Sequence, residues 1–200
     1  RIEFQIPGAG VHTISLTSAL PTITSPVVID ATTQLGFVGD PLIVLDGQNA
    51  GTGANGFYIT GGATTIRGFA IGRVSDYGIR VQTGGGNHIE GNFIGTDITG
   101  TVARPNGKDG VYIVNSPDNV VGGIAADARN TISGNADDGL MIYGSASTGN
   151  VVIGNYIGTD KTGTLPLGNS DEGLIIYSSA SDNTVGGATV SSANVISANG

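Results

Sequence analysis

Acidic residues recur just before a repeated glycine, and their type and spacing are the first sign of chemistry in the sequence. They are Asp76, Asp109, Asp137, Asp138, Asp171 and Glu172. If the repeats stack at the ~4.8 Å spacing of paired strands, neighbouring carboxylates repel each other by about 1 kcal/mol even in water. Ca²⁺ would relieve that repulsion, because it takes roughly six to eight oxygen ligands in flexible geometry. The sequence therefore predicts a candidate Ca²⁺ site with the ligands Asp109, Asp138, Asp171 and Glu172.

Two other interpretations of these acids stay open. The first is a solvated acidic edge, since Lys108 interrupts the series and the corners of a stack can splay outward. The second is a hydrolytic site, because inverting hydrolysis of a glycosidic bond uses two carboxylates ~6.5–9.5 Å apart. Residues one or two repeats apart can meet that separation, but no catalytic residue is assigned on this basis.

A second set of candidates occupies the variable position of a repeated tetrapeptide of Gly, apolar, variable and apolar residues. The tetrapeptide begins at Gly56, Gly78, Gly110, Gly139 and Gly173. Side chains such as Tyr and Arg in one row can stack on a sugar or clamp a carboxylate. We predict a glycan- or partner-binding row there, with ordinary outward residues of a pleated strand face as the alternative. Its members are Tyr58, Arg80, Tyr112 and Met141.

Strand signals surround these residues. Eight to eleven residues after each glycine comes a second short motif, which begins at Thr64, Asn87, Asn119, Asn150 and Asn183. The segments alternate apolar and variable residues with a period of two, and Gly, Asn, Asp or Ser bound them, as is typical of strands. Scarcely any ten-residue window lacks glycine, so amphipathic helices are not expected.

The spacing of the repeats predicts an all-β fold, a parallel β-solenoid of about seven coils in one domain, residues 1–200. Each repeat holds three short strands and forms one coil that pairs with the next. We expect residues 1–55 to form the first two coils and residues 56–200 to form five coils with the glycine column, the last incomplete. One interior column would hold Phe57, Ile79, Val111, Leu140 and Leu174. A second would hold Ile66, Ile89, Val121, Val152 and Val185.

Two polar features are expected to be structural. An asparagine column would form a hydrogen-bonded amide ladder at one corner, with the members Asn87, Asn119, Asn150 and Asn183. The loops that contain Asp97 and Asp160 share the sequence Ile-Gly-Thr-Asp, and in each the aspartate side chain would cap its own turn.

The composition disfavours or excludes several classes of partner and site. Glycine makes up 35 of 200 residues, only 12% of residues are charged, and 16 acids against 8 bases leave a net charge of −8. Nucleic acid and anionic membrane surfaces are therefore unfavourable partners. No apolar run approaches the ~18 residues of a membrane-spanning helix. With no cysteine, disulfides and thiolate metal sites are excluded.

Residues 150–164, Asn-Val-Val-Ile-Gly-Asn-Tyr-Ile-Gly-Thr-Asp-Lys-Thr-Gly-Thr, are similar to segments that recur in large bacterial surface and secreted proteins. The chain resembles the repeat regions of such proteins, which have the right-handed parallel β-helix of the pectin-lyase-like class. The resemblance implies right-handed coils, an extracellular or cell-surface location, and a stiff structural or adhesive module that contacts glycans.

The same resemblance implies an alternative, a polysaccharide lyase or glycoside hydrolase with a cleft near the outward tyrosine row. The characteristic motifs of the polygalacturonases are absent apart from Asp137-Asp138, and Arg80 is the only basic residue in the row. A third expectation concerns residues 197–200, which stop inside a repeat. An open coil exposes unpaired strand groups, which predicts either further repeats or association of copies end to end.

Overall fold

The computed structural model describes residues 1–200 and is nearly all β. It contains nineteen strands and three single turns of 3-10 helix, η1 (Ala31–Thr33), η2 (Ala126–Ala128) and η3 (Val190–Ser192). The predicted all-β class is confirmed. None of its helices has the length and apolar character that a membrane crossing requires.

The strands form three parallel sheets, which we call A, B and C. Sheet A contains β1 (Ile2–Glu3), β3 (Val28–Asp30), β6 (Thr65–Arg67), β9 (His88–Glu90), β12 (Val120–Gly122), β15 (Val151–Ile153) and β18 (Thr184–Val185). Sheet B contains β2 (His12–Ser15), β4 (Ile43–Asp46), β7 (Phe69–Gly72), β10 (Phe93–Ile94), β13 (Thr131–Ile132), β16 (Tyr156–Ile157) and β19 (Val195–Ile196). Sheet C contains β5 (Phe57–Ile59), β8 (Ile79–Gln82), β11 (Val111–Val114), β14 (Leu140–Tyr143) and β17 (Leu174–Tyr177).

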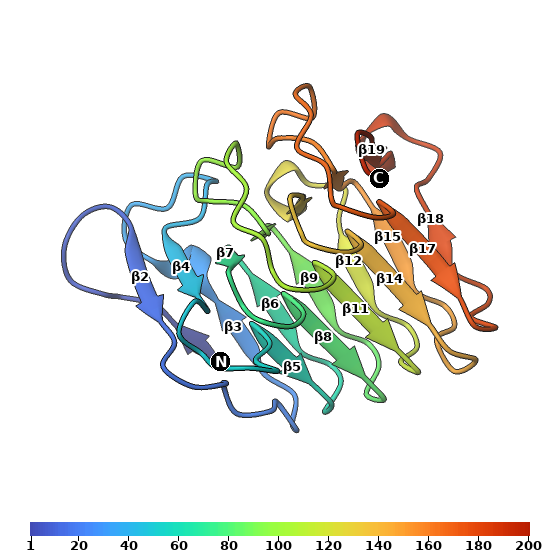
Figure 1. Ribbon diagram of the computed structural model, residues 1–200, viewed down its shortest axis with the longest axis horizontal. Coiled ribbons are helices and arrows are strands. Elements are labelled where there is room, and N and C mark those ends of the chain that lie inside the picture. Colours follow the sequence, from blue (N-terminus) through green and yellow to red (C-terminus); the bar gives the residue numbers. More distant parts are fainter.

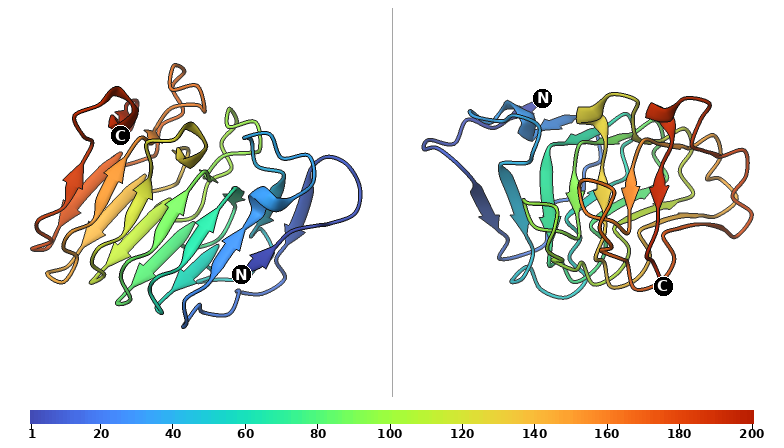
Figure 2. Two further views of the ribbon diagram at one scale, coloured as in Figure 1. Left: turned by 180° about the vertical axis from the view of Figure 1, so that it is seen from behind. Right: turned by 90° about the horizontal axis from the view of Figure 1, so that it is seen from above.

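The chain visits the sheets in the fixed order A, B, C, so each set of three strands is one coil of a parallel solenoid. In the first coil an isolated parallel bridge between Ile23 and Ile59 takes the place of a strand in sheet C. The first coil, with β2, and the last strands, β18 and β19, lie at opposite ends of the stack (Figure 1). Viewed from above, the coils follow one another along a single axis (Figure 2).

The core is a set of apolar columns inside the coils. The strand register places Phe57, Ile79, Val111, Leu140 and Leu174 side by side in sheet C, as predicted. It does the same for Ile66, Ile89, Val121, Val152 and Val185 in sheet A. One cluster of 24 buried apolar residues runs from Leu16 to Ile157. Stability therefore accumulates from contacts between neighbouring coils.

Asparagine ladders occupy all three corners between the sheets. The ladder at the corner from sheet C to sheet A contains Asn87, Asn119, Asn150 and Asn183, with amide-to-amide distances of 2.7 to 2.9 Å. The corner from A to B holds Asn92, Asn130, Asn155 and Asn194. The corner from B to C holds Asn106, Asn135, Asn169 and Asn199. Every Oδ1 except that of Asn135 also accepts a backbone N–H of the preceding coil, as that of Asn119 does from Asn87 at 3.0 Å, so the ladders join coils through side chain and backbone together.

The two long loops after β10 and β16 are closed by their aspartates, as the repeated sequence predicted. Oδ1 of Asp160 accepts the backbone N–H groups of Thr164 and Leu165, both at 3.1 Å. Asp97 accepts N–H groups in the matching loop. Lys161 reaches from the second loop to Asp40, 2.5 Å away. The contact with Asp40 ties the second loop to the segment before β4, and both aspartates are occupied within their own loops.

Candidate binding face

The outward side chains of sheet C form two columns that cross the coils. Register places Tyr58, Arg80, Tyr112, Met141 and Ile175 next to one another, one from each strand. All five are partly exposed. The four residues predicted as a binding row thus lie in consecutive coils on one face.

A longer row of tyrosines crosses the same face diagonally. Tyr77 stacks on Tyr112 with ring centroids 4.6 Å apart and planes 17° apart. Tyr112 is followed by Tyr143 at 6.4 Å and Tyr143 by Tyr177 at 5.9 Å. Sequence reasoning missed three of these rings. Tyr143 and Tyr177 share the fourth position of their strands and could have been found there, whereas Tyr77 precedes its strand.

Arg80 is fixed at the β5–β8 side of the face. Its guanidinium carbon lies 4.8 Å from the centre of the Tyr58 ring and 5.7 Å from that of Tyr77. Its Nη2 donates to Oε1 of Gln82 at 2.8 Å, and the Tyr58 hydroxyl donates to the same oxygen at 2.8 Å. The arginine is therefore held next to the two rings, where a cation and π systems attract each other.

The predicted acids gather at the beginning of the same strands. Carboxylate oxygens of Asp109, Asp137 and Asp138 lie within 4.8 Å of one another, and so do those of Asp138, Asp171 and Glu172. Asp138 belongs to both groups, and all four predicted Ca²⁺ ligands lie in this cluster. Such a set of oxygens is the donor type that a hard cation prefers. The Ca²⁺ site stays a prediction.

Lys108 divides the acidic series in two. Its Nζ lies 2.5 Å from Oδ1 of Asp76 and 4.8 Å from the centre of the Tyr77 ring. Asp76 is thereby neutralised. The remaining acids, Asp109, Asp137, Asp138, Asp171 and Glu172, form no ion pair in the structure. We call these five residues the acidic edge.

Burial and crowding change the protonation of the acidic edge. Asp109 and Asp138 are each only 2% exposed. Burial, and then the charges of Asp138 and Asp137, raise the pKa of Asp109 to about 7. Burial, and then a hydrogen bond with Glu172, raise the pKa of Asp138 to about 7. Two neighbouring carboxyls therefore hold protons near neutral pH, which a nearby cation would displace.

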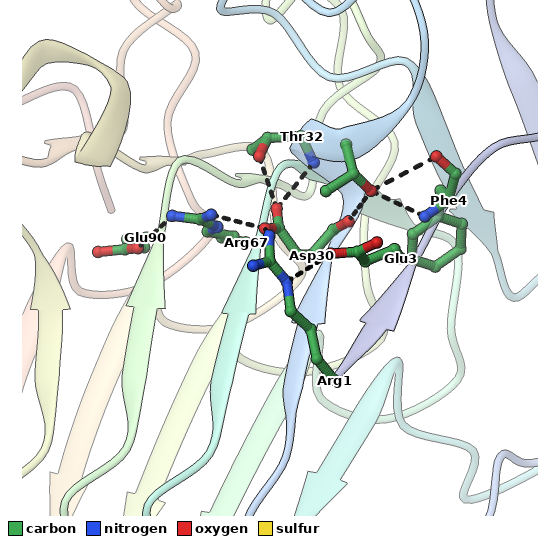
Figure 3. Close-up of polar contacts among 8 residues, drawn as sticks. Arg1, Glu3, Phe4, Asp30, Thr32, Arg67 and Glu90 are labelled. Carbon is green, nitrogen blue, oxygen red and sulfur yellow. Dashed lines mark hydrogen bonds and ion pairs between the residues drawn. The ribbon is translucent and has the colours of Figure 1, made fainter.

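A contrasting acid lies at the end of β3 in the second coil (Figure 3). Oδ2 of Asp30 accepts from Nη2 of Arg1 and from Nη2 of Arg67, each at 2.6 Å. Its Oδ1 accepts from the backbone N–H and the hydroxyl of Thr32. Burial would raise its pKa, but the hydrogen bonds from Arg67, Thr32 and Arg1 and the charge of Arg67 outweigh burial and lower the pKa to about 2. This cluster is saturated and serves the fold.

A cavity of about 310 Å³ lies between sheet B and the loop after β10. Its charged lining includes Asp46, Arg73, Asp97 and Arg104. Arg73 is bound to Asp46, and Oδ1 of Asp97 is used by its own loop. The start of the sheet C strands is distinguished by unpaired carboxylates whose oxygens lie within 4.8 Å of one another, next to partly exposed tyrosine rings.

No family model matches the chain, and no curated protein matches it.

Proposed function

We propose that this chain is a structural and adhesive module of a bacterial extracellular or cell-surface protein, and that it contacts glycans through the outer face of sheet C. The finer fold that goes with this proposal is the right-handed parallel β-helix of the pectin-lyase-like class. The observation that carries the proposal is the row of tyrosines that crosses consecutive coils on an open sheet face.

Rigidity supports the structural part. Three asparagine ladders join the coils at every corner, and most of their amides are buried. Hydrogen bonds in a low-dielectric interior polarise one another, so such ladders stiffen a stack beyond what strand pairing provides. A stiff stack keeps side chains in consecutive coils at fixed spacing, which is what an extended ligand requires.

The chemistry of the face supports glycan contact. Aromatic rings present flat apolar surfaces with a polar hydroxyl, suited to the mixed apolar and polar faces of a sugar ring. Tyr58, Tyr112 and Tyr143 are held partly exposed, and the fixed Arg80 adds donors beside them. A ligand that crosses the strands meets a new side chain at each coil.

Association of copies end to end belongs to the same proposal. β17, β18 and β19 are each paired along one edge only. Apolar residues beside these edges are exposed, among them Tyr177 at 61%, Val185 at 43% and Ile196 at 44%. Unpaired edges with apolar neighbours favour pairing with another chain. A mass that stays monomeric in light scattering up to high concentration would overturn this part.

A polysaccharide lyase or glycoside hydrolase is the second candidate. The proximity of Asp109 and Asp138 favours it, but their oxygens lie within 4.8 Å of each other, which is closer than the ~6.5–9.5 Å of inverting hydrolysis and leaves only the retaining geometry of ~5–5.5 Å. An enzyme would release reducing ends or unsaturated products from a glycan that it binds, and Asp138→Asn would abolish the release. Binding without any such product would exclude this candidate.

The experiment that tests the main proposal is a binding assay against a panel of purified polysaccharides and their oligomers, read by affinity electrophoresis and calorimetry. Tyr112→Ala should weaken binding about tenfold, because it removes the central ring of the row. His88→Ala, an exposed outward residue of sheet A, is the matched control and should bind as the wild type does. No binding to any glycan, or equal binding by both variants, would overturn the proposal.

A further inference from the structure

We infer that a groove outside the corner between sheets A and B binds a neutral sugar, namely one uncharged hexose unit of a glycan. Each coil has three sides, so this corner lies opposite sheet C. The inference therefore goes beyond the contact proposed for sheet C and does not depend on it.

Two loops at this corner form the walls of the groove. The third and fourth coils turn the corner within one or two residues, at Gly68 and Gly91, whereas the second and fifth coils insert residues 31–42 and 123–130 there. The backbone N–H of Gly91 donates to the carbonyl of Ala128 at 3.0 Å, which holds the second loop over the short corner. The two longer loops therefore project on either side of two short corners.

Two adjoining cavities lie between these loops. The larger has a volume of about 380 Å³, which is within the ~300–1,000 Å³ of small-molecule sites. The smaller has a volume of about 110 Å³, and Asp127 lines both cavities. The polar side chains of the larger cavity are Thr32, Arg67, Glu90 and Asp127. The groove therefore has room for a small ligand and polar groups to bind it.

The charges of the groove balance. Its lining contains three basic and three acidic side chains, Arg67, Arg129, Lys161, Asp40, Glu90 and Asp127. Nη1 of Arg67 lies 3.5 Å from Oε1 of Glu90 on the neighbouring strand (Figure 3). Lys161 and Asp40 form a second ion pair, at 2.5 Å. A charged ligand would meet as many like charges as opposite ones, so the groove favours a neutral ligand.

The groove offers a hydrogen-bond donor and acceptors side by side. Nε of Arg67 is buried and has no hydrogen-bond partner, although other nitrogens of its guanidinium contact Asp30 and Glu90. Asp127 is exposed and forms no ion pair. A hydroxyl group both donates and accepts, so neighbouring hydroxyls of one sugar ring can bond to such a donor and such an acceptor.

Phe37 adds a flat apolar surface to the larger cavity. Its ring is partly exposed and lines the cavity together with Ala125 and Ala128. The apolar face of a sugar ring packs on an aromatic ring, while the hydroxyls reach polar neighbours. The two charges of a free amino acid would compete with the contact between Arg67 and Glu90, whereas a hydroxyl can bond to either side chain while that contact stays. The groove therefore favours a sugar over an amino acid.

The probes are two neutral hexoses, glucose and galactose, each compared with a charged sugar of the same ring, glucosamine and galacturonate. Nuclear magnetic resonance of the isotope-labelled protein follows the backbone amides as each sugar is added at about pH 7. At least one neutral hexose should shift the amides of residues 32–40 and 124–129 until the shift saturates. Its charged counterpart should bind at least about threefold more weakly.

Phe37→Ala tests the apolar surface, and Leu35→Ala is its matched control. Leu35 lies in the same loop, is 81% exposed and lines neither cavity. Phe37→Ala should weaken binding of the hexose at least about fivefold, because it removes the aromatic ring on which the sugar packs. Leu35→Ala should bind the hexose as the wild type does.

Asp127→Asn tests the polar contact at an exposed position, where folding is not at risk. It should weaken binding of the hexose about threefold, because a charged acceptor makes a stronger hydrogen bond than an amide does. Asp182→Asn removes the same charge from an exposed position outside the groove and should not change binding. A thermal melt of each variant shows that it is folded.

The outcomes separate this inference from the function proposed for sheet C. If no hexose shifts the amides of residues 32–40 and 124–129, the inference is wrong, whatever binds to sheet C. Shifts confined to β8, β11 and β14 place the sugar on sheet C and also overturn it. Tighter binding of glucosamine or galacturonate than of the neutral hexose overturns the choice of a neutral ligand. Binding of free phenylalanine without binding of any hexose assigns the groove to an amino acid and overturns the choice of a sugar.

Discussion

Asp30 and Asp109 are both aspartates removed from solvent, at 0% and 2% exposure, yet the protein treats them in opposite ways. Asp30 receives hydrogen bonds from two arginines and Thr32, and its pKa falls to about 2. Asp109 is buried beside Asp138 and Asp137 with no ion pair, and its pKa rises to about 7.

The difference shows that burial alone determines neither the pKa of a carboxylate nor its effect on stability. A buried charge stabilises a fold where hydrogen bonds and opposite charges outweigh desolvation, and it costs stability where they do not. The asparagine ladders differ from both aspartates. Their amide side chains fill buried corners and carry no charge. A cluster that keeps an unpaired charge is therefore a better candidate for binding than the saturated one.

The largest expected effect comes from turning a ladder position into an unpaired acid. Asn119 is fully buried, and Asn119→Asp places a carboxylate against Oδ1 of Asn150, to which the native amide donates at 2.8 Å. We expect a loss of about 3–5 kcal/mol in the free energy of unfolding at pH 7. Urea denaturation measures it.

The penalty in Asn119→Asp should shrink toward pH 4, because a protonated carboxyl donates as the amide did. Asn183→Asp is the control, since Asn183 is only partly buried in the last coil and should lose less. Equal losses at both positions would show that burial in the ladder does not set the cost.

The second effect is the removal of charge from the saturated cluster. Asp30→Asn keeps the shape and the acceptor for Thr32 but weakens the contacts with Arg1 and Arg67, so we expect a loss of about 2 kcal/mol at pH 7. The wild-type pKa lies below the usual value of 3.8. Its stabilisation is therefore complete above about pH 4 and is lost as pH falls toward 2.

Unfolding free energies at several pH values should thus show wild type and Asp30→Asn converging below about pH 3. A constant difference across that range would contradict the assignment of the low pKa to Asp30.

The third change is expected to raise the free energy of unfolding, whereas the first two lower it. Asp109→Asn with Asp138→Asn removes two carboxylates whose folded pKa values lie above the usual value of 3.8. In the wild type such groups lower stability progressively as pH rises from about 4 to about 7. The double variant should be more stable than the wild type by about 1 kcal/mol at pH 8 and no more stable at pH 4. Thermal unfolding at the two pH values tests this, and a double variant that is less stable at pH 8 would contradict it.

The fold could be predicted from the sequence because its signals repeat in register. The glycine tetrapeptide fixed the strands of sheet C, and Asn87 and its equivalents marked one corner. The other two ladders were missed although their asparagines lie five residues apart in the pairs Asn130–Asn135 and Asn194–Asn199. That spacing corresponds to one strand of sheet B and the corner residue on each side of it. The sequence therefore did contain the pattern that marks these two ladders.

The electrostatics could not be predicted in the same way. Asp30 and Arg67 are 37 residues apart and become neighbours only through the pairing of β3 with β6. The unequal burial of Asp109 and Asp171 likewise depends on how much of each corner the next coil covers. The sequence spacing identified the acidic residues. Only the packed coils show which of their carboxyl groups are buried.

The smallest expected effect tests a carboxylate that is satisfied by donors within its own loop. Hydrogen bonds from the N–H groups of Leu165, Thr164 and Thr162 and from the Thr162 hydroxyl outweigh desolvation and lower the pKa of Asp160. Asp160→Ala should cost about 0.5–1 kcal/mol, because its contacts lie within one exposed loop. Hydrogen exchange should accelerate at the Thr164 and Leu165 amides while core amides in β14 exchange as before. Faster exchange in β14 would mean that the loop helps to hold the stack, and Asp160 would then belong with Asp30 among the acids that serve the fold.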